Sequence, residues 1–212
     1  MEVELIRDTH TINSIEELEE LYGLPNESAL KKQTSFIVEP GRAFIEASPF
    51  LILATASENG VDCSPKGDAP GFVQLFDENT LLIPDRPGNK RVDGMKNILQ
   101  NSKVGIIFMI PGSGVTYRVN GNATISTDPK LLDRFLVRDK RPCSVVIVRV
   151  KEAFHHCPKA FVRSKLWSKK DTLVDNLVPN TGTFADYRDG GNDAYAKKYE
   201  SDYQIRIKET LY

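Results

Sequence analysis

The sequence has no apolar run long enough to cross a membrane. A membrane-spanning helix needs roughly 18–20 apolar residues in succession, whereas the longest apolar run here, residues 104–110, has the length of a strand. The opening residues MEVELIRDTH are acidic and polar, where a signal peptide is first basic and then apolar. We therefore expect a soluble, cytoplasmic protein.

Cysteine and histidine are scarce, with three of each in 212 residues. An odd number of cysteines without a framework spacing is typical of reduced thiols in the cytosol. The run His155-His156-Cys157 could suggest zinc, but adjacent strand residues point to opposite faces and the sequence has no CxxC or HExxH, so we predict no metal site. We interpret the run as a strand-to-helix junction in which Cys157 is a small buried group. Without GxSxG, and with so few histidines, a Ser-His-Asp hydrolase is also disfavoured.

The sequence also lacks a surplus of positive charge. Its formal net charge is −1 at pH 7, whereas general nucleic-acid binding is typical of chains rich in Lys and Arg. Basic residues nevertheless gather at Arg86, Lys90 and Arg91, and again between residues 159 and 170. Each patch alone is more typical of solvated surface charge. Together, on a nearly neutral protein, they favour a small anionic ligand over a polymer.

The middle of the chain is rich in short strands separated by turn signals such as Glu58-Asn59-Gly60. Residues 116–125 alternate between apolar and polar side chains, which predicts a strand with one buried face. The predicted strands span residues 50–56, 61–64, 72–76, 80–83, 104–110, 116–125 and 144–150. Because predicted helices interrupt them only at about 89–101 and 129–137, the pattern indicates a mainly β (α+β) protein with six or seven antiparallel strands in a closed or partly closed barrel.

Helices are predicted towards both ends of the chain. The capping box Ser14-Ile-Glu-Glu17 opens the first, which closes near Gly23, and further helices follow Asn26 and span 40–47. A helix is predicted over 158–167, a loop over 176–191, and a last helical turn or two over 193–198. No linker divides the chain, so we expect one domain over 1–212, with an N-terminal helical extension (1–40) and a C-terminal helix and loop segment (157–212).

Two loops carry the groups that bind phosphate. Residues 63–71 and 83–91 each follow a strand, are dense in Gly and Pro, and carry hydroxyl, amide and cationic groups. The second loop opens into the helix predicted at 89–101, whose free N–H groups and dipole favour an anion. The loop can be interpreted equally well as a phosphate cradle or as a simple helix cap with exposed charges. The sequence contains neither a Walker loop nor GxGxxG.

A third candidate lies near the end of the barrel sequence. On a helix, Lys159, Arg163 and Trp167 would stack at four-residue spacing, which suits a ligand that is both anionic and planar. The alternative is that Trp167, the single tryptophan, packs in the core or in an interface.

Several segments together resemble a known family. These are SPFLILAT at 48–55, SPKGDAPGF at 64–72, LLIPDRPGNKRVDGMKNIL at 81–99, RVNGNATI at 118–125 and FHHCPKAFVRSKLW at 154–167. In this order they resemble the predicted flavin-nucleotide-binding branch of the pyridoxamine 5′-phosphate oxidase-like proteins, over about 40–170. The resemblance implies a six-stranded antiparallel split β-barrel with peripheral helices, which forms a homodimer with FMN at the subunit interface.

The resemblance also implies which residues bind FMN. Ser64 and Lys66 lie on the strand-end motif, Arg86, Asn89, Lys90 and Arg91 on the following loop, Thr116 and Arg118 on the strand that approaches the flavin of the second subunit, and Arg163, Ser164 and Trp167 in a C-terminal segment that closes over the ring or phosphate.

Two segments depart from the oxidase pattern. The strand reads VDCSPKG instead of the Arg-x-Val-Leu-Leu-Lys type, and the ending DYQIRIKETLY does not match the Arg-x-Leu substrate motif. The resemblance therefore supports flavin binding rather than vitamin B6 oxidation itself. We expect an FMN-dependent oxidoreductase acting on a small molecule, with no catalytic acid or base identified. The alternatives are a flavin-binding module without its own catalysis and a split-barrel reductase that uses the deazaflavin F420.

Overall fold

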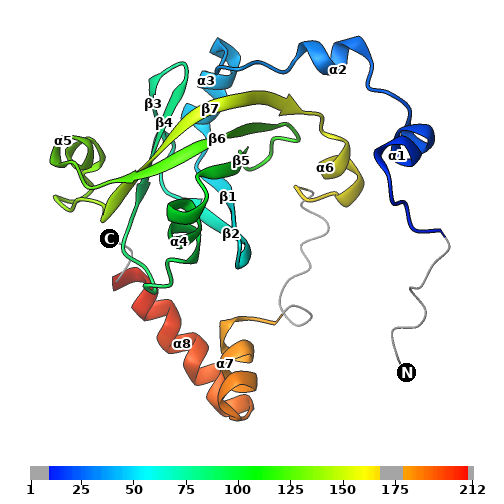
Figure 1. The fold of residues 1–212 in the computed structure, drawn as a ribbon. Coiled ribbons are helices and arrows are strands. Elements are labelled where there is room, and N and C mark those ends of the chain that lie inside the picture. Colours follow the sequence, from blue (N-terminus) through cyan, green and yellow to red (C-terminus); the bar gives the residue numbers. More distant parts are fainter. Residues whose placement is uncertain (1–9, 168–178, 210–212) are drawn as a thin grey trace. The chain divides into compact units, whose positions relative to one another are not determined.

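The computed structural model describes residues 10–167 and 179–209. Contacts along the chain divide it into two units, Met1–Gln33 and Thr34–Tyr212. Figure 1 shows the course of the chain. Among the described residues, no helix is both long enough and apolar enough to cross a membrane.

The first unit carries two short helices, α1 (Ile15–Tyr22) and α2 (Glu27–Lys31). The Ser14 hydroxyl accepts a hydrogen bond from the N–H of Glu17 at 3.1 Å, and the Asn26 side chain caps α2 in the same way. Both predicted helix starts are therefore confirmed. The reason is local, because each cap satisfies N–H groups that the first turn leaves without an intrahelical partner.

The second unit is built on one antiparallel sheet of seven strands, in the order β2-β1-β5-β6-β7-β4-β3 (Figure 1). This confirms the predicted class, with one strand more than the resemblance implied. The strands are β1 (Phe50–Ser57), β2 (Gly60–Gly67), β3 (Gln74–Asp77), β4 (Thr80–Asp85), β5 (Lys103–Met109), β6 (Thr116–Ser126) and β7 (Ser144–His156).

Several strand boundaries differ from the prediction; β2, for example, runs to Gly67 instead of ending at 64. Strand β7 continues to His156 instead of ending at 150, because it pairs with β6 along its whole length, from Ser126↔Val145 to Thr116↔His156. Strand β3 begins at Gln74 rather than at 72. Cys157 follows directly after β7 and is exposed, so its predicted burial is wrong. The residue lies beyond the last strand pair, where no neighbouring strand covers it.

The helices of this unit depart from the prediction mainly at their ends. They are α3 (Glu39–Ala47), α4 (Asp93–Gln100), α5 (Pro129–Leu132) with the 3₁₀ turn η2 (Asp133–Phe135), α6 (Lys159–Ser164), α7 (Thr181–Asp189) and α8 (Asp193–Glu209). Helix α4 starts at Asp93 rather than 89, because Lys90 takes a left-handed conformation with φ 64°. Lys165 does the same with φ 52° and ends α6. We had predicted that Lys159, Arg163 and Trp167 share one helical face. This prediction is wrong, because α6 ends before Trp167.

The C-terminal prediction of a loop over 176–191 is wrong for its described part. Residues 181–189 form α7, which the Asn180 side chain caps and left-handed Gly190 ends at φ 65°. The Asn, Gly and Asp residues that suggested a loop are thus largely the caps of two helices. Helix α8 extends to Glu209, well beyond the predicted turn or two.

The core lies on the inner face of the sheet. Strand β6 shows the predicted alternation, since Tyr117 and Val119 are buried while Arg118 and Asn120 are not. Helix α3 contributes Ile45 and helix α4 contributes Ile98; the main strand residues of the cluster are Leu51, Leu53, Leu81, Ile83, Ile106, Phe108, Val146 and Val148. This packing holds α4 and the loop before it against the sheet.

Candidate functional site

A cavity of about 400 Å³ opens between the end of β2, the loop of residues 86–92 and the first turn of α4. We call it the loop cavity. Its lining includes the strand-end and loop residues predicted for FMN binding, which are Ser64, Lys66, Arg86, Asn89, Lys90 and Arg91. Two segments that lie apart in the sequence thus meet in one concave site.

Two of the cavity's cations are engaged in ion pairs at the ends of β2 and β4, one within the strands and one between the residues that directly follow them. The Lys66 ammonium pairs with the carboxylate of Asp85, and the Arg86 guanidinium donates to Asp68 at 2.7 Å. Only 16% of the Arg86 side chain and 7% of the Asp68 side chain are exposed. The sheet order places β2 at one edge and does not pair it with β4. These ion pairs therefore link two strands that no β-ladder joins.

The other two cations lie at the mouth of the cavity. The Asn89 side chain accepts the N–H of Arg91 at 2.9 Å, and this turn sets the path of Lys90, which has a left-handed backbone. The Arg91 guanidinium pairs with Asp93. Within the described residues, no ion pair engages Lys90. Lys90 and Arg91 are thus the cations that a ligand can recruit.

The first turn of α4 adds backbone donors to the same cavity. Val92 precedes the helix, and in the described chain no side chain caps this end. Gly94 and Met95 line the cavity, so uncapped N–H groups and the positive end of the helix dipole lie beside it. Such an arrangement favours an anion.

Polar side chains of β1 and β2 fix the position of α4. A Cβ on Gly94 would lie 3.0 Å from Oδ2 of Asp62 and 3.5 Å from the hydroxyl of Thr55, so glycine allows a close approach. Asn97 donates to Thr55 at 3.2 Å. The Ser64 hydroxyl donates to Asp62 at 2.6 Å and is therefore already engaged within the protein.

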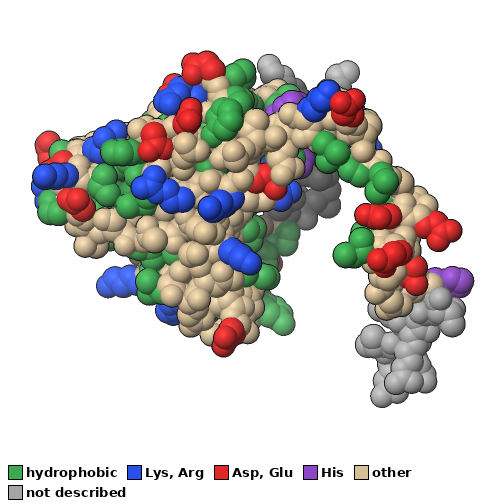
Figure 2. All heavy atoms as spheres, turned by 45° about the horizontal axis from the view of Figure 1, so that its top comes forward, with side chains coloured by type: hydrophobic (Ala, Val, Ile, Leu, Met, Phe, Trp, Pro, Cys, Tyr) green, Lys and Arg blue, Asp and Glu red, His purple; other side chains and the backbone are tan. Residues whose placement is uncertain are grey.

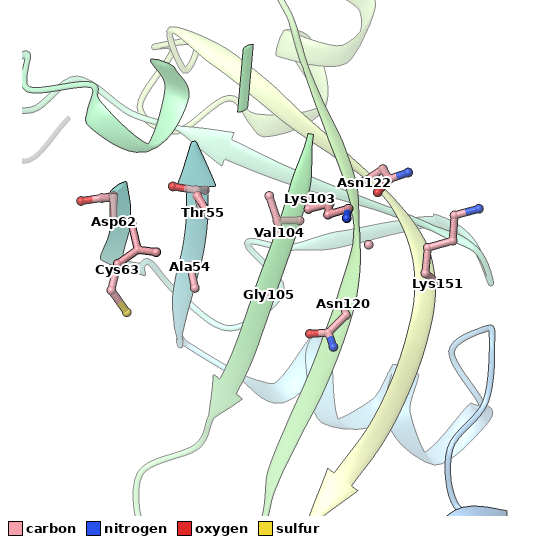
Figure 3. Close-up of a pocket in the computed structure, with 13 residues that line it drawn as sticks. Ala54, Thr55, Asp62, Cys63, Lys103, Val104, Gly105, Asn120, Asn122 and Lys151 are labelled. Atoms are coloured by element: carbon pink, nitrogen blue, oxygen red, sulfur yellow. The ribbon is translucent and has the colours of Figure 1, made fainter. Parts of the chain in front are cut away.

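A second hollow, the outer groove, lies on the outer face of the sheet and has a volume of about 590 Å³. Figure 3 shows it across β2, β1, β5, β6 and β7. Small residues make the hollow, since Cys63, Ala54, Gly105 and Asn120 are consecutive partners across neighbouring strands. A Cβ on Gly105 would lie 3.4 Å from Oδ1 of Asn120, which shows how closely the floor is packed.

Charge elsewhere on this unit is mixed. On the face that Figure 2 shows, Lys and Arg side chains lie among Asp, Glu and apolar side chains rather than in one continuous basic surface. Among the described residues, no group of three or more His, Cys, Asp or Glu side chains could hold a metal ion.

The comparison with protein families is decisive for the fold family. The family described as pyridoxamine 5′-phosphate oxidase matches residues 37–157, which is more than half of the chain. The protein belongs to this family. The match covers the whole sheet, the loop cavity and the outer groove.

Solved structures with a similar fold were also found. HupZ of Group A Streptococcus is 24% identical over 56% of this chain and 93% of its own, with a TM-score of 0.46. A Clostridium acetobutylicum protein related to general stress protein 26, of the pyridoxinephosphate oxidase family, is 12% identical over 56% and 86%, with a TM-score of 0.43. An FMN-binding protein of Syntrophomonas wolfei is 13% identical over 66% and 92%, with a TM-score of 0.42. No match was found among curated proteins.

In this family member, Thr116 and Arg118 do not line the loop cavity. Thr116 is buried, with 6% of its surface exposed. Arg118 lies beside the outer groove, where it donates to Asn120 at 3.2 Å, pairs with Glu152 and covers the ring of Phe154.

The C-terminal candidates also lie outside the loop cavity. The Ser164 hydroxyl donates to the carbonyl of Phe161 at 3.3 Å. Trp167 stacks on Phe161 and donates its indole N–H to the carbonyl of Ser113 at 2.7 Å. Because 38% of Trp167 is exposed, it is not a residue of the buried core. Arg163, on α6, is exposed.

Our sequence analysis missed the carboxylates of the site. Asp62, Asp68, Asp85 and Asp93 each bond to a predicted site residue. Asp68 and Asp85 come from different segments than their partners, so no local signal reveals them. The pair of Arg91 and Asp93 is separated by a single residue and could have been found from the sequence.

Proposed function

We propose that this family member binds FMN with its phosphate in the loop cavity, and that it is an FMN-dependent oxidoreductase acting on a small molecule. One observation carries the proposal. The end of β2, the basic loop and an uncapped helix start converge on a single cavity. Backbone N–H groups, a helix dipole and side-chain cations together are the groups that hold a phosphate ester.

The chemistry of the donor set fits a phosphate. Lys90 and Arg91 supply charge that no buried ion pair holds, and charge-assisted hydrogen bonds to phosphate are among the strongest that proteins form. Lys66 and Arg86 add positive potential at the cavity wall, although Asp85 and Asp68 balance it. In this proposal Asn89 positions the loop rather than contacting the ligand, because its side chain accepts the N–H of Arg91.

We further propose that the protein is a homodimer in which a second copy covers the outer face of the sheet. The outer groove has an apolar floor, and Ile107, on the same face, is a large apolar residue with 38% of its surface exposed. Burying such a surface is the usual driving force for association. In this arrangement the strand that carries Thr116 and Arg118 approaches the flavin from the partner subunit, and Arg163, Ser164 and Trp167 belong to the segment that closes over the ring or phosphate.

A bound flavin would supply the redox chemistry, and the chain would supply binding, orientation and charge. Lys90, Arg91 and the α4 amides would fix the phosphate end, which is remote from the reacting ring. An Arg or Lys near the N1 side of the ring would stabilise a negative charge there. We assign no catalytic acid or base.

The spectrum of the purified protein tests the cofactor. A yellow protein with flavin absorbance bands, whose colour bleaches on addition of NAD(P)H, is the expected result. Flavin bands that NAD(P)H does not bleach would support instead a flavin-binding module without its own catalysis. A deazaflavin spectrum would show that the cofactor is F420 instead of FMN.

Substitution tests the phosphate site. The double variant Lys90→Ala/Arg91→Ala should lose FMN affinity by about tenfold or more, with little change for riboflavin, because only FMN carries the phosphate. The matched control is Lys197→Ala/Lys198→Ala, an exposed basic pair on α8. Equal losses for FMN and riboflavin would show that the loop does not hold the phosphate. Fluorescence titration of each flavin gives the affinities.

A further inference from the structure

We infer that Asp93 is an internal competitor of the ligand phosphate, and that it limits how strongly the loop cavity prefers a phosphorylated flavin over an unphosphorylated one. The inference rests on the proposed function and adds a specificity-determining residue to it. Asp93 was not among the residues predicted from the sequence.

Asp93 holds a carboxylate beside the loop cavity rather than among its lining residues, and Arg91 lines both the loop cavity and the adjoining hollow that contains Asp93. It is the first residue of α4, at the positive end of the helix dipole. Its Oδ2 accepts a hydrogen bond from Nε of Arg91, and its Oδ1 lies 3.5 Å from the ammonium of Lys96. The protein's own anion thus takes up donors that an incoming phosphate would use.

Competition between Asp93 and a phosphate for Arg91 affects binding because the other cations of the cavity are already paired. Lys66 and Arg86 are held in largely buried ion pairs with Asp85 and Asp68. That leaves Lys90 and Arg91 as the cations able to move towards a ligand, and Asp93 holds one of them. The Arg91 side chain is 80% exposed and that of Asp93 37%. An exposed ion pair is weak and can be exchanged for a stronger contact.

The Asp93 charge persists at neutral pH. The hydrogen bond from Arg91 is the main cause that lowers the pKa of Asp93 below its ordinary value, partial desolvation opposes this shift, and the charges of Arg91 and Lys96 add to it. The carboxylate is therefore ionised at neutral pH, and a substitution is needed to remove its charge there.

The test is the affinity of Asp93→Asn for FMN and for riboflavin, measured by flavin fluorescence titration with the full-length protein. Asparagine keeps the shape and removes the charge. We expect FMN to bind about two- to fivefold more tightly, the range that an exposed ion pair supports, with riboflavin unchanged. In an Arg91→Ala background the gain should vanish, because Asp93 acts through Arg91. Asp193→Asn, at the first residue of α8, is the matched control and should change neither affinity.

The expected gain cannot arise from loss of folded protein, which would weaken binding of both flavins. Unchanged or weaker FMN binding by Asp93→Asn would overturn the inference and show instead that Asp93 orients Arg91 for the ligand. A gain that survives in the Arg91→Ala background would also overturn it. If the wild-type protein binds no FMN, the proposed function fails and the inference fails with it.

Discussion

Replacing Asp68 with alanine should destabilise the fold far more than replacing Asp133, although both aspartates form the same kind of ion pair. Arg86 donates through Nε to Asp68 at 2.7 Å, and Arg141 donates through Nε to Asp133 at 2.6 Å. The difference is burial. The side chains are 16% and 7% exposed in the first pair and 50% and 46% exposed in the second.

The expected loss in the free energy of unfolding depends on how well the remaining arginine is solvated after each substitution. Without Asp68, the Arg86 guanidinium stays largely buried and loses its carboxylate partner, keeping a longer 3.3 Å contact to the carbonyl of Phe135. The Asp68 side chain also accepts the N–H of Ala69 at 2.8 Å, and this bond is lost as well. We expect a loss of about 2–4 kcal/mol in the free energy of unfolding. For Asp133→Ala, water solvates the freed Arg141, so the expected loss is below about 1 kcal/mol.

The assay is urea denaturation followed by far-ultraviolet circular dichroism, with flavin removed because a bound ligand adds stability of its own. The double variant Asp68→Ala/Arg86→Met removes the stranded charge and should recover part of the loss. Equal costs for Asp68→Ala and Asp133→Ala would refute the reasoning. So would a double variant whose loss is the sum of the two single losses.

Three further predictions concern packing, the tryptophan and assembly. Gly121→Ala should cost about 1–3 kcal/mol in a urea titration, because the new Cβ would lie 2.3 Å from a carbonyl oxygen of β7, whereas Gly88→Ala, with open space around it, should cost little. Binding of FMN should quench the emission of Trp167, and Trp167→Phe should bind FMN more weakly; unchanged emission and equal affinity would leave Trp167 only as the support of Ser113. The flavin-loaded protein should scatter light as a dimer at micromolar concentration, and Ala54→Lys in the outer groove should make it a monomer; a wild-type monomer with FMN bound would exclude the proposed assembly.

Local sequence patterns were enough to predict the strands, the early helices and the location of the candidate phosphate loop. These features depend on residues close together in the chain. The alternation along 116–125 indicates a buried face, and Ser14 and Asn26 cap the helices that follow them. The cluster Arg86, Lys90 and Arg91 is visible as a motif, and the family match at residues 37–157 agrees with the resemblance drawn from such motifs.

Helix ends were harder to predict, because they depend on backbone conformations that composition does not specify. The left-handed conformations of Lys90 and Lys165 moved the start of α4 and the end of α6. As a result, Trp167 lies beyond α6 and contacts Ser113, which is 54 residues away in the sequence. No periodicity in 158–167 contains that information.

The distribution of charge in the candidate site depends on how the strands pack and could not be predicted from the sequence. The basic residues alone left a phosphate cradle and a helix cap with exposed charges equally open. In the fold, β4 comes close to the end of β2, so that Asp85 meets Lys66 and Asp68 meets Arg86, across 19 and 18 residues of sequence. Electrostatic energy depends on distance in space and on burial rather than on separation along the chain. The sequence therefore identified the cations. The fold holds Lys66 and Arg86 in largely buried ion pairs and Arg91 in an exposed pair with Asp93, while no ion pair within the described residues engages Lys90.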